Sequence, residues 1–105
     1  MARGILYVES EPDAAEAAAY HEWYDGTHMA EMLGIDGLVS ARRFAPLDGE
    51  GPFVAVYEIE ADDVAAVEAR LAEATRSGRF SAPVGLRRDK PPTLRFYREI
   101  STHTA

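Results

Sequence analysis

The segment Phe53–Ile59 carries the strongest strand signal in this chain, and it is apolar at every position but one. Successive side chains of an extended strand point to opposite faces of a sheet. The odd-numbered positions of this segment therefore share one face, and Val54 and Val56 share the other. A sheet built around this strand needs an apolar cover on both faces, because soluble proteins rarely leave such a face in water.

The other regular segments set the order of elements along the chain. Residues 4–9, 38–44 and 93–100 have strand-type patterns, and residues 14–33 and 62–77 are rich in helix formers. The second helix carries an apolar stripe at Val64, Val67, Leu71 and Ala74. The order β-α-β-β-α-β predicts a ferredoxin-like α+β fold, an antiparallel four-stranded sheet with two helices on one face.

The first helical segment is interrupted by Gly26 and Thr27. Asp13 is the expected N-cap of the segment. We expect a kink at the interruption, with Thr27 capping a second short helical piece that runs to Leu33.

Two helices can cover only one face of such a sheet, which leaves the face of Val54 and Val56 open. A second copy of the chain packed sheet to sheet would cover it, so we expect a homodimer. The alternative is a mixed surface that water tolerates.

Composition narrows the possible partners and compartments. With 105 residues the chain is expected to form one domain over 1–105. Eighteen acidic against 11 basic residues give a formal charge of −7, which disfavours a nucleic acid partner. Cysteine is absent, and no signal peptide or membrane-spanning stretch is visible, so we expect a cytoplasmic protein without a membrane partner. Asn and Gln are also absent, a bias typical of a GC-rich, bacterial genome.

Side chains suited to chemistry gather in the first helical segment, over residues 20–28. Positions 17, 21, 24 and 28 fall on one face of a regular helix. A mostly apolar pocket is the functional interpretation, with aromatic walls and a few polar groups. The structural alternative is that these aromatic side chains belong to the core and that the histidines only make structural contacts.

Neighbouring strands offer further candidates for the wall of this pocket. Arg42 and Arg43 are consecutive, so at most one of them can face a given pocket from a strand. Tyr57, on the strongest strand, is the other candidate.

Residues 20–28 and 33–44 resemble the dimeric α/β-barrel superfamily, and in particular its small EthD-like members. Those proteins carry a W-Y-x-x-x-H helix motif, matched here by Trp23, Tyr24 and His28. Their following glycine and strand arginine correspond to Gly37 and to Arg42 or Arg43. The proline that usually precedes this glycine is Asp36 here, which puts the shape of the turn in doubt.

This resemblance implies a homodimer whose two sheets form a barrel, with a pocket between sheet and helices in each subunit. Similar proteins include cofactor-independent monooxygenases, polyketide cyclases, decarboxylases, isomerases and haem-handling enzymes. The superfamily narrows the position of the site more than its chemistry.

The leading functional hypothesis is a small cofactor-independent enzyme that acts on an aromatic or polyketide-like molecule. His28 would be the general acid or base. Tyr24 or Tyr20 would donate a hydrogen bond to a developing enolate or phenolate, Trp23 would form an apolar wall, and Arg42 would add positive charge. The alternatives are a ligand-binding or accessory homodimer without turnover, and a structural dimer whose aromatic residues are only core. A metal site, or haem held through His28, is less favoured than a site without cofactor.

Residues 79–92 form a long segment without clear periodicity. Such a segment is either a lid or interface arm, whose basic residues contact a partner or an anionic ligand, or a solvated connection.

Overall fold

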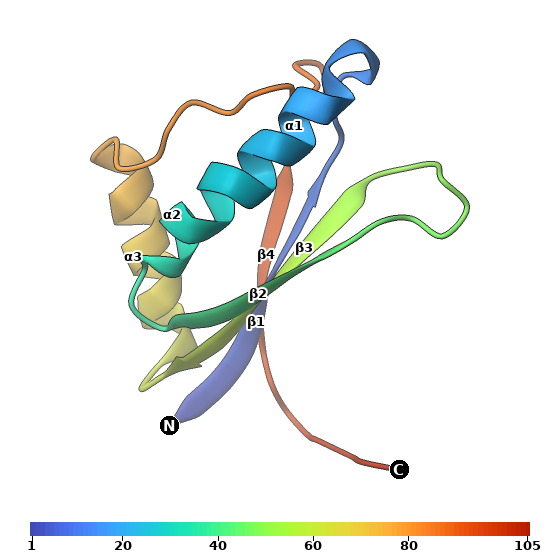
Figure 1. The fold of residues 1–105 in the computed structure, drawn as a ribbon. Helices are drawn as coiled ribbons and strands as arrows, with labels where there is room; N and C mark the ends of the chain where they lie inside the picture. Colours follow the sequence, from blue (N-terminus) through green and yellow to red (C-terminus); the bar gives the residue numbers. More distant parts are fainter.

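A computed structural model describes residues 1–105 as a four-stranded antiparallel sheet with helices on one side (Figure 1). The strands are β1 (Ala2–Ser10), β2 (Leu38–Phe44), β3 (Phe53–Ala61) and β4 (Thr93–Arg98). Their spatial order is β2-β3-β1-β4, and every neighbouring pair is antiparallel. The predicted ferredoxin-like α+β fold is confirmed. Residues 99 and 100, expected in the last strand, lie beyond it, and Ile100 is exposed.

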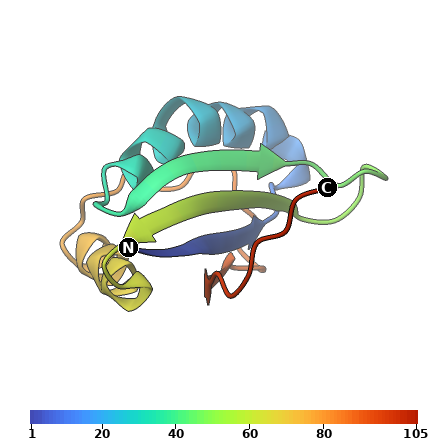
Figure 2. The ribbon, with the colours of Figure 1, turned by 90° about the horizontal axis from the view of Figure 1, so that it is seen from below.

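The first helical segment is one continuous run, which we call the helical arm (residues 14–33). It comprises a 3-10 turn η1 (Ala14–Glu16), α1 (Ala17–Trp23), a π-helical turn η2 (Tyr24–His28) and α2 (Met29–Leu33). Asp13 caps its start by accepting a hydrogen bond from the Ala15 N–H, as predicted. Figure 2 shows the arm running along β2.

The expected Thr27 cap is wrong. Thr27 lies inside η2, and neither end of that turn has a capping side chain. The helix continues through Gly26, which keeps a negative φ, and the turn that contains Gly26 and Thr27 is widened to a π-helical turn.

The core lies between the sheet and the helices, on the face predicted from the alternation in β3. Ala55, Tyr57 and Ile59 are buried there, beside Leu6 and Val8 of β1. The second helix, α3 (Val64–Arg76), begins at an N-cap formed by Asp63. Its predicted apolar stripe is buried over its whole length.

No helix covers the other face of the sheet (Figure 1). Ile5, Tyr7, Val54 and Val56 face outward near its centre and are half-buried. Larger apolar side chains at its edges are open to solvent, with Phe44 45% and Tyr97 42% exposed. Apolar side chains therefore lie on both faces of the sheet, as predicted, and the outer face also carries Arg42, Glu58 and Arg95. None of the helices is long and apolar enough to span a bilayer.

Candidate functional site

A cavity of about 430 Å³ lies between the helical arm, the sheet, α3 and the loop at residues 79–92. This volume is within the ordinary range for a small-molecule site, roughly 300–1,000 Å³. The residues that line it are Val8, Ser10, Trp23, Tyr24, His28, Met32, Leu71, Thr75, Phe80, Ser81, Ala82, Pro83, Leu86, Pro92 and Leu94. None of them is acidic, and none is lysine or arginine. The cavity therefore has apolar walls and a few neutral or weakly basic polar groups.

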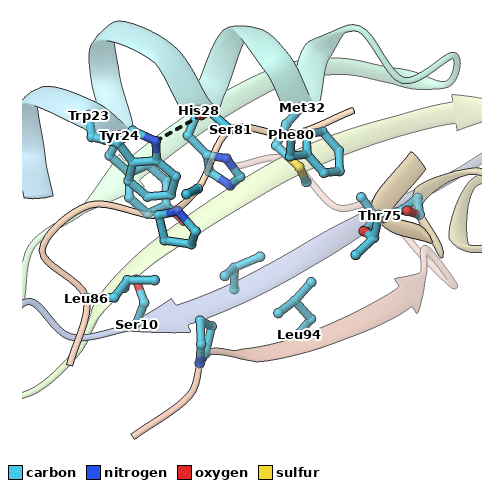
Figure 3. Close-up of a pocket in the computed structure, with 15 residues that line it drawn as sticks. Ser10, Trp23, Tyr24, His28, Met32, Thr75, Phe80, Ser81, Leu86 and Leu94 are labelled. Carbon is cyan, nitrogen blue, oxygen red and sulfur yellow. Dashed lines mark hydrogen bonds between the residues drawn. The ribbon is translucent and has the colours of Figure 1, made fainter. Parts of the chain in front are cut away.

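The π-helical turn brings Trp23 and His28 together in this cavity. The Met29 N–H donates to the Tyr24 carbonyl, five residues earlier, instead of the residue four back. The indole and imidazole rings stack with centroids 4.6 Å apart and 20° between their planes. Figure 3 shows both side chains projecting from the arm, with Phe80 on the other side of His28. Turns of this kind often occur at functional sites.

The predicted helical face of positions 17, 21, 24 and 28 is wrong, because the widened turn changes the angular spacing. His21 contacts Phe53 and Arg43, whereas His28 faces the cavity. Tyr24 lies between the two groups and contacts both Arg43 and His28.

His28 is largely enclosed, with its side chain 20% exposed. Its Nδ1 atom is buried and has no hydrogen-bond partner. Burial lowers the pKa of His28 below its ordinary value of 6.5, and the nearby Glu31 carboxylate partly opposes this shift. The imidazole is therefore neutral near pH 7 and able to accept a proton.

Glu31 and Ser81 are polar neighbours of His28 that the sequence analysis did not select. The Glu31 carboxylate accepts two hydrogen bonds from Ser81, one from its N–H (2.9 Å) and one from its hydroxyl (3.0 Å). The same hydroxyl oxygen accepts a hydrogen bond from Trp23 Nε1 at 3.3 Å (Figure 3). Residues three apart on a helix are neighbours, so the sequence could have identified Glu31 as a neighbour of His28. No local signal connects Ser81 to either residue.

Tyr24 lines the cavity, but the other two predicted tyrosines lie behind its wall. Tyr20 is completely buried, and its hydroxyl lies 2.6 Å from the Ser10 hydroxyl. Tyr57 is also completely buried and donates to the sulfur of Met29. Burial raises the pKa of Tyr24 and of Tyr57, so both hydroxyls keep their protons at neutral pH.

The two arginines of β2 point to opposite faces of the sheet, and neither lines the cavity. Arg42 pairs with Val56 on the outer face and is 65% exposed in its side chain, so it cannot supply charge to the cavity. Arg43 faces the arm, where it binds Asp25 and lies 3.0 Å from His21 Nδ1. Its guanidinium also lies 4.3 Å from the centre of the Tyr24 ring.

The loop at residues 79–92 forms one wall of the cavity and is fastened at two places. Ser81 holds it to Glu31 of α2. At the other end Arg87 and Lys90 bind Glu11, and the Asp13 N–H donates to the Gly85 carbonyl. Two basic residues of the loop, for which a partner or an anionic ligand was one expectation, are thus paired within the chain. No group of three or more carboxylate or histidine side chains is placed to hold a metal ion.

The fold and the cavity define a ferredoxin-like α+β domain with a small-molecule-sized site. Two solved structures share this fold over nearly their whole length. One is described as "a putative monooxygenase from Shewanella loihica", with 18% identity, a TM-score of 0.67, and coverage of 97% of this chain and 99% of that one. The other is an ethyl tert-butyl ether D (EthD) family protein from Bacillus halodurans, with 16% identity, a TM-score of 0.56, and coverage of 95% and 100%.

The expected likeness to EthD-like proteins is thus confirmed in fold. At these identities the likeness does not extend to the chemistry of the site. No family model matches the sequence, and no curated protein matches it.

Proposed function

We propose that this protein is a small cofactor-independent enzyme in which His28 acts as general acid or base on an aromatic or polyketide-like molecule. The observation that carries the proposal is the enclosed imidazole in an apolar cavity. Its pKa is lowered by burial, so it is a free base at neutral pH. Proton transfer by such a group contributes roughly 10²–10⁴ to a reaction rate.

The substrate binds with its acidic C–H or O–H toward His28 and its rings against Trp23 and Phe80. Because no acidic residue, lysine or arginine lines the cavity, the substrate enters in its uncharged form. Proton transfer to His28 then leaves an enolate or phenolate inside the site. Tyr24, which keeps its proton, is the hydrogen-bond donor for that oxyanion.

Cyclisation, isomerisation and oxygenation of an activated phenol by O₂ all start from such an anion, whereas decarboxylation produces one by loss of CO₂ and then needs a proton from the imidazolium. Oxygenation accords with the description of the Shewanella protein. We therefore propose the proton transfer that these reactions have in common.

A homodimer is the second part of the proposal. The outer sheet face carries the exposed Phe44 and Tyr97 around a half-buried apolar centre. It also carries charges of both signs, Arg42 and Arg95 with Glu58, so a second copy related by a two-fold axis can pair with it.

The test measures proton abstraction directly. Exchange of the α-hydrogen of an aryl ketone in D₂O is followed by NMR, with and without the protein. Wild type is expected to accelerate exchange, and His28→Ala is expected to slow the catalysed rate by roughly 10²–10⁴. His28→Gln is expected to be equally slow, because an amide cannot accept the proton.

A binding module gives a different result in the same experiment. The ketone would perturb the His28 resonances while exchange stayed at the background rate. Native mass spectrometry of freshly purified protein is the companion measurement. It reports a retained ligand, and a mass gain equal to haem would contradict the cofactor-independent part of the proposal.

A further inference from the structure

Glu31 lies beside His28, next to the Nδ1 atom of the imidazole ring. Its Oε1 atom lies 3.7 Å from His28 Nδ1, which is within ion-pair range but too long for a hydrogen bond. That Nδ1 atom is buried without any other partner. The two side chains are similarly enclosed, 20% exposed for His28 and 22% for Glu31.

The carboxylate is held in place from the loop, across 50 residues of sequence. The Ser81 N–H binds one carboxylate oxygen, and the Ser81 hydroxyl binds Oε1, the oxygen nearest His28. Ser81 is itself tied to Trp23, the residue on which His28 stacks. These bonds, led by the Ser81 N–H, also lower the pKa of Glu31, so the carboxylate is ionised at neutral pH.

The other surroundings of His28 provide no competing charge. Tyr24 is the only other titratable side chain in contact with the ring, and it stays protonated. The loop presents Phe80 and Ser81, and β1 and β4 present Val8 and Leu94 to the same cavity. Glu31 is therefore the single charged group that faces the imidazole.

We propose that Glu31 is the positioning residue of His28: it accepts the Nδ1–H, which leaves Nε2 as the proton acceptor, and it stabilises the imidazolium that forms. This inference deepens the proposed function and rests on it for the reaction. The substrate proton moves to Nε2, and its electron pair stays on the substrate as an enolate or phenolate. The proton on Nδ1 remains with His28, and the gap to Glu31 closes to about 2.7–2.9 Å, the length of a charge-assisted hydrogen bond.

The test measures the tautomer and the pKa of His28 by ¹⁵N NMR, with His28→Gln used to assign its resonances. In wild type we expect the Nδ1–H tautomer. In Glu31→Gln we expect the pKa of His28 to fall, because the imidazolium loses its neighbouring negative charge. Glu22→Gln, at an exposed site on the same arm, is the matched control and should leave that pKa unchanged.

A purely structural role for Glu31 would loosen the loop without moving the titration of His28. An unchanged pKa in Glu31→Gln, or an Nε2–H tautomer in wild type, would overturn the inference. If Glu31→Gln does not fold, Glu31→Asp answers the same question. Aspartate keeps the carboxylate but places it farther from His28, so the pKa of His28 should fall by less than in Glu31→Gln. No change in that pKa would again overturn the inference.

The titration also separates this inference from the proposed function. If wild type shows no ketone exchange, the proposed function fails, whereas the tautomer and pKa still decide the pairing of His28 with Glu31. If exchange is present, Glu31→Gln should lower kcat about tenfold with little change in KM. This loss is smaller than the roughly 10²–10⁴-fold loss expected when His28 itself is removed.

Discussion

The rings of Trp23 and His28 are stacked 4.6 Å apart although the two residues are five positions apart in the chain. In a regular α-helix, residues five apart point in directions about 140° different around the axis. The wider turn of η2 removes most of this difference. A π-helical turn is thus the reason that the imidazole reaches an aromatic wall inside the cavity.

Gly26 lies within this widened turn, with a helical backbone and nothing within 4 Å of the position where a Cβ would be added. Gly26→Ala should therefore raise the free energy of unfolding by about 0.5–1 kcal/mol, since alanine loses less backbone entropy in a helix. Gly37→Ala is the opposite control. There φ is +103° and the new Cβ would lie 2.6 Å from Val67 Cγ2, so stability should fall. Urea unfolding measures both, and a destabilising Gly26→Ala would contradict the geometry of η2.

Stability should decrease in mild acid because of His28. Its pKa in the folded protein is lowered from 6.5, mainly by burial, so the unfolded chain binds the proton more readily. The loss begins as pH falls through 6.5 and continues until pH reaches the lower, folded-state pKa. Glu31 does not interfere in this window, because its pKa lies below 4.5. Unfolding curves between neutral pH and about pH 5 should show a smaller loss for His28→Gln than for wild type; equal losses would show that His28 titrates normally.

Arg43 should be important for stability even though it does not line the cavity. Its side chain is 14% exposed and contacts Asp25, His21 and the Tyr24 ring. Arg43→Met should lower the free energy of unfolding by roughly 1–2 kcal/mol, because it removes charge-assisted hydrogen bonds and a cation–π contact.

Arg76 pairs with Glu73 on the surface of α3 and provides the control for this substitution. Arg76→Met should change stability by less than about 0.5 kcal/mol, since exposed ion pairs contribute little. Equal effects of the two substitutions in thermal unfolding would argue against the role of Arg43 under the arm.

The two attachments of the loop should be separable by hydrogen–deuterium exchange. Ser81→Ala removes a hydrogen bond to Glu31 and the acceptor for Trp23, so exchange should quicken around residues 79–83. Glu11→Gln weakens the pairing with Arg87 and Lys90, so exchange should quicken around residues 86–90. Faster exchange along the whole loop in either variant would show that it opens as one unit.

Val56 is the position that tests the proposed homodimer, because it lies on the outer face beside Tyr7 and Arg42. Sedimentation of wild type at micromolar concentration should give a mass near twice 11.5 kDa. Val56→Asp should shift the equilibrium toward monomer by placing a charge in an apolar interface. Val84→Asp, the same change in an exposed part of the loop, should not. A monomeric wild type would rule out the second copy as the cover of this face.

The sequence by itself determined the order of elements, the two faces of β3 and the N-cap at Asp13. These features depend on interactions between residues close in sequence and on the period of side chains along strands and helices. The candidate His28 and its aromatic neighbours Trp23 and Tyr24 were likewise visible, because they lie within six consecutive residues.

Only the tertiary structure decided how these residues are used. A helical pattern assumes a constant turn, so it placed His21 with His28 and could not reveal η2. Strand alternation requires Arg42 and Arg43 to separate, but the pairing of β2 with β3 decides that Arg43 faces the arm. Ser81 meets Glu31 from a loop 50 residues away, and no local period connects such positions. The environment of His28 is therefore a product of chain segments brought together by the core.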